Sequence, residues 1–304
     1  MNTSRRAFIK NGSVAIAGAA VFPKLLIQQK SPHIMLGLQL YTVRDDMKSD
    51  PAGTLKKVAA IGYKYVEAAG YEDGKFYGYS IPGFKKLLTD TGLKMLSGHS
   101  FLGSKQWDAG KNDFTDEWKQ TIEDAAAVGM KYLISPGVDE SLCKNMDDFK
   151  HYMEMFDKTG MLCKKAGIKF AFHNESYEFN HDLDGKVLYD LILQSTDKNL
   201  VVQQIDIGNM YATGGRAMHF LKKYPGRFPL MHVKDEMKKN VPGKDGSTYE
   251  STLLGKGVVG VKEIVDYARK NGTNYFVIEQ EEYQNITPLE SAAADYKTMK
   301  DWGF

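Results

Sequence analysis

Short apolar runs typical of strands alternate along most of the chain with longer segments whose apolar residues recur every three or four positions. The runs predict strands at residues 34–41, 63–68, 94–99, 132–135, 168–175, 200–206, 229–234 and 274–280. The periodic segments predict helices at residues 51–61, 81–91, 116–128, 147–166, 183–194, 216–223, 261–270 and 288–301. Several helices are followed by glycine, which readily forms the left-handed turn that ends a helix: Gly62, Gly92, Gly129, Gly167 and Gly272.

Eight βα units within residues 31–304 favour a closed parallel barrel, the α/β fold known as the (β/α)8 or TIM barrel, over an open doubly wound sheet. No Pro/Ser-rich linker or break in composition divides these residues. We therefore expect one barrel domain spanning residues 31–304.

The longest predicted irregular stretch is residues 235–258, after the seventh strand. Unstructured loops of this length usually serve as lids or binding loops, which is the role we expect here. Residues 255–260 match the dinucleotide-binding pattern GxGxxG, but they follow a loop rather than a strand. A junction between a loop and a helix is the better interpretation.

Charge separates the N-terminal segment from the rest of the chain. The net charge is +2, yet residues 1–30 hold five basic and no acidic residues, which leaves 35 basic against 38 acidic residues beyond them. The segment Ser4–Lys10 resembles a twin-arginine export signal, and the apolar run at residues 14–22 is too short to span a bilayer. We expect an exported, periplasmic protein without a stable membrane span after removal of residues 1–30. The acidic remainder disfavours nucleic acid as a partner.

The carboxyl ends of the predicted strands carry the polar residues. These ends form the active-site face of a parallel barrel, and we expect its candidate residues there: Gln39, Tyr41, Glu67, His99, His173, Glu175, Gln204, Asp206, His232, Lys234, Glu279 and Glu281. Side chains two positions apart share a face of a strand, so His173 points with Glu175 and Gln204 points with Asp206. The acids and imidazoles should therefore converge at the mouth of the barrel.

So many carboxylates at one place repel one another unless they are protonated or hold a cation. Imidazole and carboxylate ligands suit one divalent ion of Mn, Co, Zn, Fe or Mg, and no thiolate is placed to select a softer metal. We expect Asp206, His232 and Glu279 as ligands, with His173 or Glu175 as the fourth. The only cysteines, Cys143 and Cys163, are expected to be buried thiols.

Several segments together resemble the sugar phosphate isomerase/epimerase family, whose fold is the xylose isomerase-like TIM barrel. They are residues 37–44, 62–67, 172–179, 206–209, 232–235 and 278–281. The resemblance implies the metal ligands given above, and it implies that Asn209 and Lys234 touch the sugar. Many relatives read His-Asn-His where this chain has His173, Asn174 and Glu175. The fourth ligand and one catalytic base therefore stay open between His173 and Glu175.

The resemblance implies a metal-dependent isomerase or epimerase that removes the proton beside a carbonyl through a metal-stabilised enediolate. Glu175 and Glu279 are the candidates for acid/base work, with His173 and His99 as imidazole alternatives. Gln39, Tyr41, Glu67, His99 and Gln204 are expected to join Asn209 and Lys234 in binding the substrate. Export favours a neutral sugar or glycoside over a sugar phosphate.

Two other functions are kept beside the isomerase. One is a lyase or hydratase acting on 3-keto-glycosides, and the other is a non-catalytic envelope protein that binds sugars. A DNA-repair endonuclease of the same barrel is disfavoured because the chain has only seven histidines and a negative mature domain. A homo-oligomer is compatible with the sequence.

Overall fold

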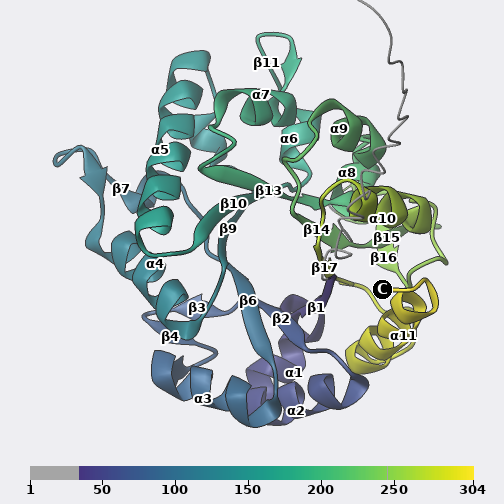
Figure 1. Cartoon of the computed structure of the whole chain (residues 1–304). Helices are drawn as coiled ribbons and strands as arrows, with labels where there is room; N and C mark the ends of the chain where they lie inside the picture. Colours follow the sequence, from purple (N-terminus) through teal and green to yellow (C-terminus); the bar gives the residue numbers. More distant parts are fainter. Residues whose placement is uncertain (1–33, 245) are drawn as a thin grey trace, which may run out of the picture. The chain divides into compact units, whose positions relative to one another are not determined.

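Parallel strands close into a barrel in the computed structural model, which describes residues 34–244 and 246–304 (Figure 1). In order around the barrel the strands are β1 (Met35–Gln39), β2 (Tyr65–Ala68), β6 (Lys94–His99), β9 (Tyr132–Pro136), β10 (Lys169–His173), β13 (Val201–Asp206), β14 (Leu230–Val233) and β17 (Tyr275–Ile278). Strand β17 pairs with β1 and completes the ring. The predicted fold class and all eight predicted strand positions are confirmed.

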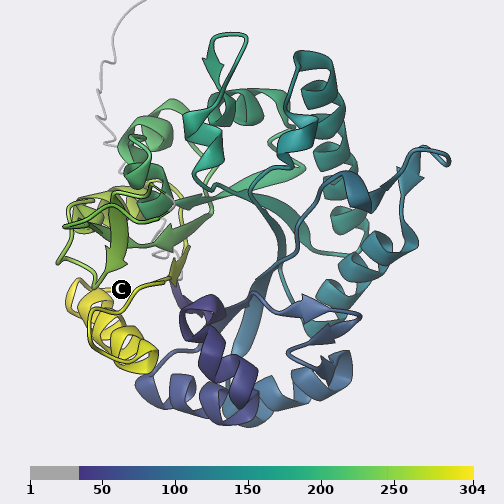
Figure 2. The ribbon, with the colours of Figure 1, turned by 180° about the vertical axis from the view of Figure 1, so that it is seen from behind.

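Helices surround the barrel, as the view from behind also shows (Figure 2). They are α1 (Arg44–Ser49), α2 (Pro51–Ile61), α3 (Ile81–Thr91), α4 (Asp116–Val128), α5 (Met146–Lys165), α6 (Tyr177–Asn180), α7 (Leu188–Ser195), α8 (Ile207–Ala212), α9 (Ala217–Lys223), α10 (Val261–Lys270) and α11 (Pro288–Asp301). Side-chain caps begin several of them, including the Thr287 hydroxyl of α11, which accepts from the Glu290 amide. Gly92 and Gly129 end α3 and α4 in the left-handed conformation, with φ of 71° and 106°.

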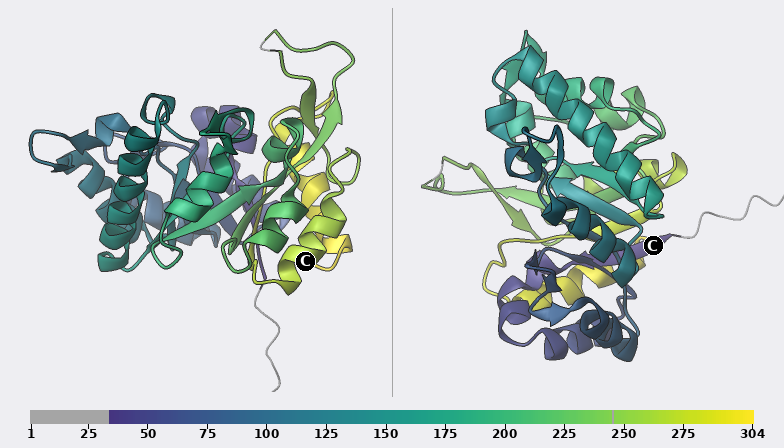
Figure 3. Two further views of the ribbon diagram at one scale, coloured as in Figure 1. Left: turned by 90° about the horizontal axis from the view of Figure 1, so that it is seen from above. Right: turned by 90° about the vertical axis from the view of Figure 1, so that its left-hand side faces the viewer.

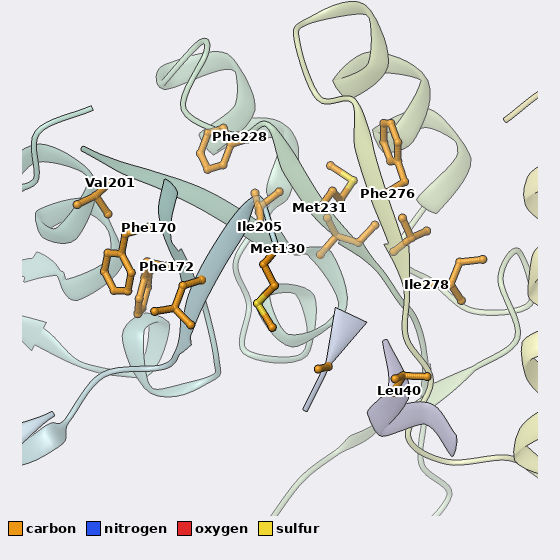
Figure 4. Packing of buried hydrophobic residues seen from close by; sticks show 14 of the residues in the cluster. Leu40, Met130, Phe170, Phe172, Val201, Ile205, Phe228, Met231, Phe276 and Ile278 are labelled. Carbon is orange, nitrogen blue, oxygen red and sulfur yellow. The ribbon is translucent and has the colours of Figure 1, made fainter. Parts of the chain in front are cut away.

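Alternation along the strands divides the core into two layers. Phe170 and Phe172 of β10 point outward and pack between the barrel and its helices, together with Met231 and Phe276 (Figure 4). A smaller cluster fills the interior of the barrel: Leu96, Ile134, Ala171, Leu230, Tyr275 and Val277. The outward-facing side chains of the strands pack against the helices. The inward-facing positions near the carboxyl ends of the strands are therefore available for polar side chains.

Several predicted element boundaries differ from the structure, and two of these differences have a clear local cause. The first strand ends at Gln39, because residues 40–43 form a 3-10 helix whose Tyr41 amide is capped by the Gln39 side chain. The helix predicted over residues 183–194 begins only at Leu188. The residues before it form the hairpin of β11 (Asp182–Leu183) and β12 (Lys186–Val187), with Asp184 at φ 52° in its turn.

The prediction that residues 235–258 form an irregular stretch was wrong. Strands β15 (Asp235–Lys238) and β16 (Tyr249–Thr252) form an antiparallel hairpin that projects beyond the barrel (Figure 3). Asp235 organises the return to α10, because its carboxylate accepts hydrogen bonds from the amides of Gly255, Gly257 and Val259 at 2.9–3.1 Å. Residues 255–260 are the expected junction between a loop and a helix.

Two further loops of the barrel form small antiparallel sheets. After β2 lie β3 (Tyr71–Glu72), β4 (Lys75–Phe76) and β5 (Tyr79–Ser80), and after β6 lie β7 (Trp107–Asp108) and β8 (Asp113–Phe114). Phe76 is buried against Phe84, and the Tyr77 hydroxyl accepts from the Ala69 amide at 2.9 Å. These rings cover the rim of the barrel.

Both cysteines are free and buried, as expected. The export signal predicted for residues 1–30 lies outside the described residues. Among the residues that the structure describes, no helix is long and apolar enough to cross a membrane.

Asp295 of α11 provides a test of the packing by pH. Burial raises the pKa of this carboxyl to about 7, and among the described residues only its Oδ1 has a hydrogen-bond partner, the Leu254 amide at 2.8 Å. Because an unfolded aspartate has a pKa near 3.9, the folded chain holds an extra proton between about pH 4 and 7, and this contribution to stability is lost as the pH rises through that window.

We therefore expect Asp295→Asn to be more stabilising at pH 8 than at pH 5. The change that it causes in the free energy of unfolding should be more favourable at pH 8 by on the order of 2 kcal/mol. Urea unfolding at both pH values measures this difference. Asp301→Asn, an exposed change on the same helix, should show no such pH dependence. Equal effects of Asp295→Asn at both pH values would mean that this carboxyl is not protonated in the folded protein.

Candidate metal and active site

Neighbouring strands bring the predicted polar residues together at the carboxyl end of the barrel. Gln39 lies opposite Glu67, His173 lies opposite Gln204, and Asp206 lies opposite His232 in the strand register. Glu279 follows β17 directly. The convergence expected from alternation along the strands is therefore what the structure contains.

Glu67 is the centre of a buried network beneath the mouth. Its Oε1 accepts from Gln39 Nε2 at 2.9 Å, and its Oε2 accepts from Ser97 Oγ at 2.5 Å and from Gln204 Nε2 at 2.7 Å. His232 Nε2 lies 2.5 Å from Oε1. Burial alone would raise the pKa of Glu67, but the nearby imidazoles of His232 and His99 hold that pKa below its usual range.

This network orients the imidazoles. Gln204 donates its amide NH2 to Glu67, so its Oε1 accepts from His173 Nδ1 and from His99 Nε2, each at 3.0 Å. His173 Nε2 is then left facing Asp206 Oδ2 at 3.9 Å. His232 donates from Nε2 to Glu67, which turns its Nδ1 toward Glu279 Oε2 at 3.0 Å and Asp206 Oδ2 at 3.6 Å.

Lys234 supplies positive charge to the same acids. Its ammonium lies 3.2 Å from Glu279 Oε2 and 3.7 Å from Asp206 Oδ2, donates to Asn209 Oδ1 at 3.0 Å, and contacts Glu281 Oε1. Burial would raise the pKa of both Asp206 and Glu279, but Lys234 and the imidazoles lower both. The acids are therefore ionised and able to bind a cation.

Asp206 carries the clearest mark of a metal site. Its Oδ1 caps α8 by accepting from the Asn209 amide at 2.7 Å, whereas its fully buried Oδ2 has no hydrogen-bond partner among the described residues. Ligand atoms of Asp206, His232 and Glu279 all lie within 4.8 Å of one another. A buried carboxylate oxygen without a donor, beside an imidazole nitrogen turned toward carboxylates, fits a divalent ion.

The geometry favours His173 over Glu175 as the fourth ligand. His173 is buried, and its free Nε2 faces Asp206, whereas the Glu175 side chain is 48% exposed. Glu175 Oε2 accepts from Asn209 Nδ2 at 2.8 Å, and its Oε1 lies 3.5 Å from His173 Nε2. Glu175 thus lies at the rim of the site, where a substrate has access to it.

Glu178 fixes the backbone at Glu175. Its carboxylate accepts from the Glu175 amide at 2.9 Å and from the Val138 amide at 3.0 Å. Burial raises the pKa of Glu178 to about 7. The carboxylate therefore ties together the loops after β9 and β10.

The residues expected to bind the substrate differ in burial. Gln39, Glu67 and Gln204 are fully buried, and the Glu67 carboxylate accepts hydrogen bonds from the side-chain amides of the other two. Tyr41 is exposed at the mouth, where the Arg44 guanidinium lies 4.7 Å from the centre of its ring. The remaining expected residues, His99, Asn209 and Lys234, line the same cluster as Asp206 and Glu279.

Sequence reasoning missed two supporting residues. Ser97 lies in a strand and carries no signal beyond facing the interior. Gly208 does have a sequence signal, because it lies between the predicted ligand Asp206 and Asn209. In the structure, a Cβ at this position would lie 2.7 Å from Cγ of Lys234. Only glycine leaves room for the lysine stem to cross the start of α8.

Glu67→Gln tests the positioning role of the network. The amide places a donor against the donors of Gln204 and Ser97, which misorients His232, and changes behind a ligand typically weaken metal binding 10–100-fold. We expect a loss of affinity for Mn²⁺ or Co²⁺ of about that size by calorimetry. The exposed change Glu72→Gln is the matched control, and unaltered affinity in Glu67→Gln would exclude the role.

Comparison with known proteins places the fold in a family. The family model described as xylose isomerase-like TIM barrel matches residues 55–302, so the chain belongs to the xylose isomerase-like TIM-barrel family. The chain is 25% identical over 273 residues to an inosose dehydratase of Clostridium perfringens, an alignment that covers 81% of this chain and 88% of that protein.

Solved structures agree with this assignment. A sugar phosphate isomerase/epimerase from Parabacteroides distasonis superposes with a TM-score of 0.73 at 26% identity, covering 88% of this chain and 99% of the other. A xylose isomerase-like TIM-barrel protein from Mycobacterium smegmatis, solved in complex with magnesium, superposes with a TM-score of 0.62 at 15% identity, covering 89% and 96%. The expected family and barrel type are confirmed.

Proposed function

We propose that the chain is a metal-assisted enzyme that removes the proton beside the carbonyl of a cyclic keto sugar or keto glycoside, after which an oxygen substituent leaves the next carbon. The observation that carries the proposal is the unpartnered Oδ2 of Asp206 beside His232 and Glu279, with the accessible Glu175 at the rim. The dehydratase relative supports elimination as the outcome.

Asp206, His232, Glu279 and His173 would hold the ion. A divalent cation bound there would polarise the carbonyl and stabilise negative charge on its oxygen. Lys234, fixed by Asn209 and Glu279, is placed to donate a hydrogen bond to a substrate oxygen.

Glu175 is the group we assign to proton removal. Its position beside Asn209 and His173 holds the carboxylate at the rim. When it takes the proton, the electron pair of the C–H bond becomes the new C=C bond, and the C–O bond at the next carbon breaks with its pair going to oxygen. His99, partly exposed and hydrogen-bonded to Gln204, is the candidate that gives the departing oxygen a proton.

A pocket of about 350 Å³ beside the mouth suits a ring-shaped leaving group. Its lining includes Tyr41, Arg44, Met47 and Tyr77, and its residues Leu40 and Tyr41 follow β1 at the end of the barrel that carries the site. The aromatic rings of Tyr41 and Tyr77, together with the Arg44 guanidinium, suit contact with sugar or aromatic rings. The pocket therefore supports a glycoside as the substrate.

The test is incubation with 3-keto-glycosides and with neutral ketoses in D₂O with added Mn²⁺ or Co²⁺. Release of the leaving group, with an unsaturated ketone as the co-product, supports elimination. If neither substrate exchanges its proton nor reacts, although the protein carries a stoichiometric metal ion, the proposal fails.

Isomerisation or epimerisation is the second candidate, supported by the name of the Parabacteroides distasonis relative. In this reaction the proton returns to the neighbouring carbon or to the opposite face, and no substituent leaves. Deuterium incorporated with the leaving group retained would establish this outcome. A sugar-binding protein without catalysis would show neither reaction and would bind sugar in the presence of a chelator.

Export through the twin-arginine route is part of the same proposal, supported by the sequence Ser4–Lys10. Replacing Arg5 and Arg6 by lysine should keep the protein inside the cell, which fractionation would show.

A further inference from the structure

A three-residue pattern recurs in consecutive turns at the end of the barrel opposite the site. Glycine, an apolar residue and lysine follow four successive helices, at residues 62–64, 92–94, 129–131 and 167–169. In each case the lysine precedes or begins a barrel strand, and the strands are β2, β6, β9 and β10, which are neighbours around the barrel. One half of this end is therefore edged with lysine: Lys64, Lys94, Lys131 and Lys169.

Three of these lysines, Lys94, Lys131 and Lys169, line an apolar cavity of about 810 Å³. Its described lining includes Met35, Tyr65, Leu96 and Tyr132 from the strands. Five exposed lysines, and no acidic residue among those described, complete the lining: Lys85, Lys94, Lys131, Lys164 and Lys169. None of these five forms an ion pair with a described residue, although Lys85 donates to the Ala127 carbonyl at 2.8 Å.

Basic residues also lie at this end in the other half of the barrel, where Lys222 and Lys223 are in the last turn of α9 and Arg269 and Lys270 in the last turn of α10. Their position at a helix C-terminus is favourable in itself. The two halves differ at the starts of the strands, because β13, β14, β17 and β1 are preceded by Leu200, Pro229, Asn274 and Ile34 instead of lysine. Lysines at the starts of neighbouring strands, around an apolar cavity, are expected of a surface that meets an anionic partner.

We propose that this end of the barrel docks on an anionic lipid surface. The lysines face the headgroups, and the apolar cavity is available for an acyl chain. An anionic surface with apolar chains beneath it matches both parts of this lining, the lysines without ion pairs and the apolar residues between them. The active site then faces away from the lipid.

Flotation of the full-length protein with vesicles tests the proposal. We expect binding to vesicles with 30% phosphatidylglycerol, weak binding to pure phosphatidylcholine, and release by salt. Each lysine near such a surface contributes about fivefold in affinity, so Lys94→Gln, Lys131→Gln and Lys169→Gln together should weaken binding roughly 100-fold.

The matched control removes the same charge from the opposite end, by Lys105→Gln, Lys238→Gln and Lys256→Gln, and should bind as the wild type does. Both variants retain the basic N-terminal segment, so binding through that segment alone would leave them equal and would overturn the proposal. Equal binding of the wild type to both kinds of vesicle would also overturn it.

Hydrogen exchange on the wild-type protein keeps the test valid if the triple variant does not fold. Vesicles should slow exchange in peptides that contain residues 92–96, 129–132 and 167–170. The β15–β16 hairpin at the other end should exchange as before. Protection of the hairpin instead would assign membrane contact to the wrong end of the barrel.

Discussion

Glu175→Gln is expected to lower kcat by about 10²–10⁴-fold, the range for loss of a general base, while the bound metal remains. Glutamine keeps the size of the side chain and an oxygen for Asn209 Nδ2, but it cannot take a proton at neutral pH. Because the Glu175 side chain is 48% exposed and lies outside the Asp206–His232–Glu279 cluster, metal content and thermal stability should change little.

The measurement is single-turnover chemistry on the keto substrate, with metal counted by mass spectrometry in the same samples. Glu140→Gln is a suitable control, since Glu140 is an exposed acid in the preceding βα loop. Loss of metal together with activity would instead make Glu175 a ligand. Full activity would assign proton removal to another group, with Glu279 the remaining carboxylate candidate.

Asp206→Asn is expected to remove the metal itself. The Oδ1 atom keeps its cap on α8, but the atom that points into the site becomes an amide NH2, which cannot act as a ligand. Changes behind a ligand weaken binding 10–100-fold, so loss of a ligand should exceed roughly 100-fold, with activity lost in parallel. Calorimetric titration with Mn²⁺ or Co²⁺ measures the affinity.

Asp182→Asn, an exposed change in the β11–β12 hairpin, serves as the control. Loss of activity in Asp206→Asn is not sufficient evidence, because the substitution also removes a negative charge 3.7 Å from Lys234. The decisive measurement is the affinity for the metal ion. Wild-type affinity for both ions in Asp206→Asn would show that the unpartnered oxygen has another purpose and that the metal binds elsewhere.

The regular elements of this barrel were predictable because their signals are local. Apolar residues every three or four positions define α5, and glycine at residue 129 ends α4, without reference to distant contacts. Alternation also placed Gln204 on the same side as Asp206, since both lie in β13. Glu175 lies two residues beyond the end of β10, so alternation does not apply to it. Closure of the barrel brings the strand ends together, which is why the membership of the site followed from them.

The roles within the site depended on contacts that span the whole chain. Glu67 and Gln204 are 137 positions apart, and their hydrogen bond joins Gln204 to the carboxylate that contacts His232. The choice of His173 over Glu175 rests on which nitrogen Gln204 engages. The return from the β15–β16 hairpin to α10 depends on Asp235, whose carboxylate accepts a hydrogen bond from an amide about 20 residues later.

Local pattern thus determined the barrel, its strand ends and the kinds of group that meet there, since backbone period and side-chain chemistry are properties of short segments. Folding decided which of those groups are buried, which nitrogen carries a proton, and that four lysines from separate turns share one end. Burial and hydrogen-bond partners are set by residues far apart in the chain, and they come together only when β17 pairs with β1 and the barrel closes.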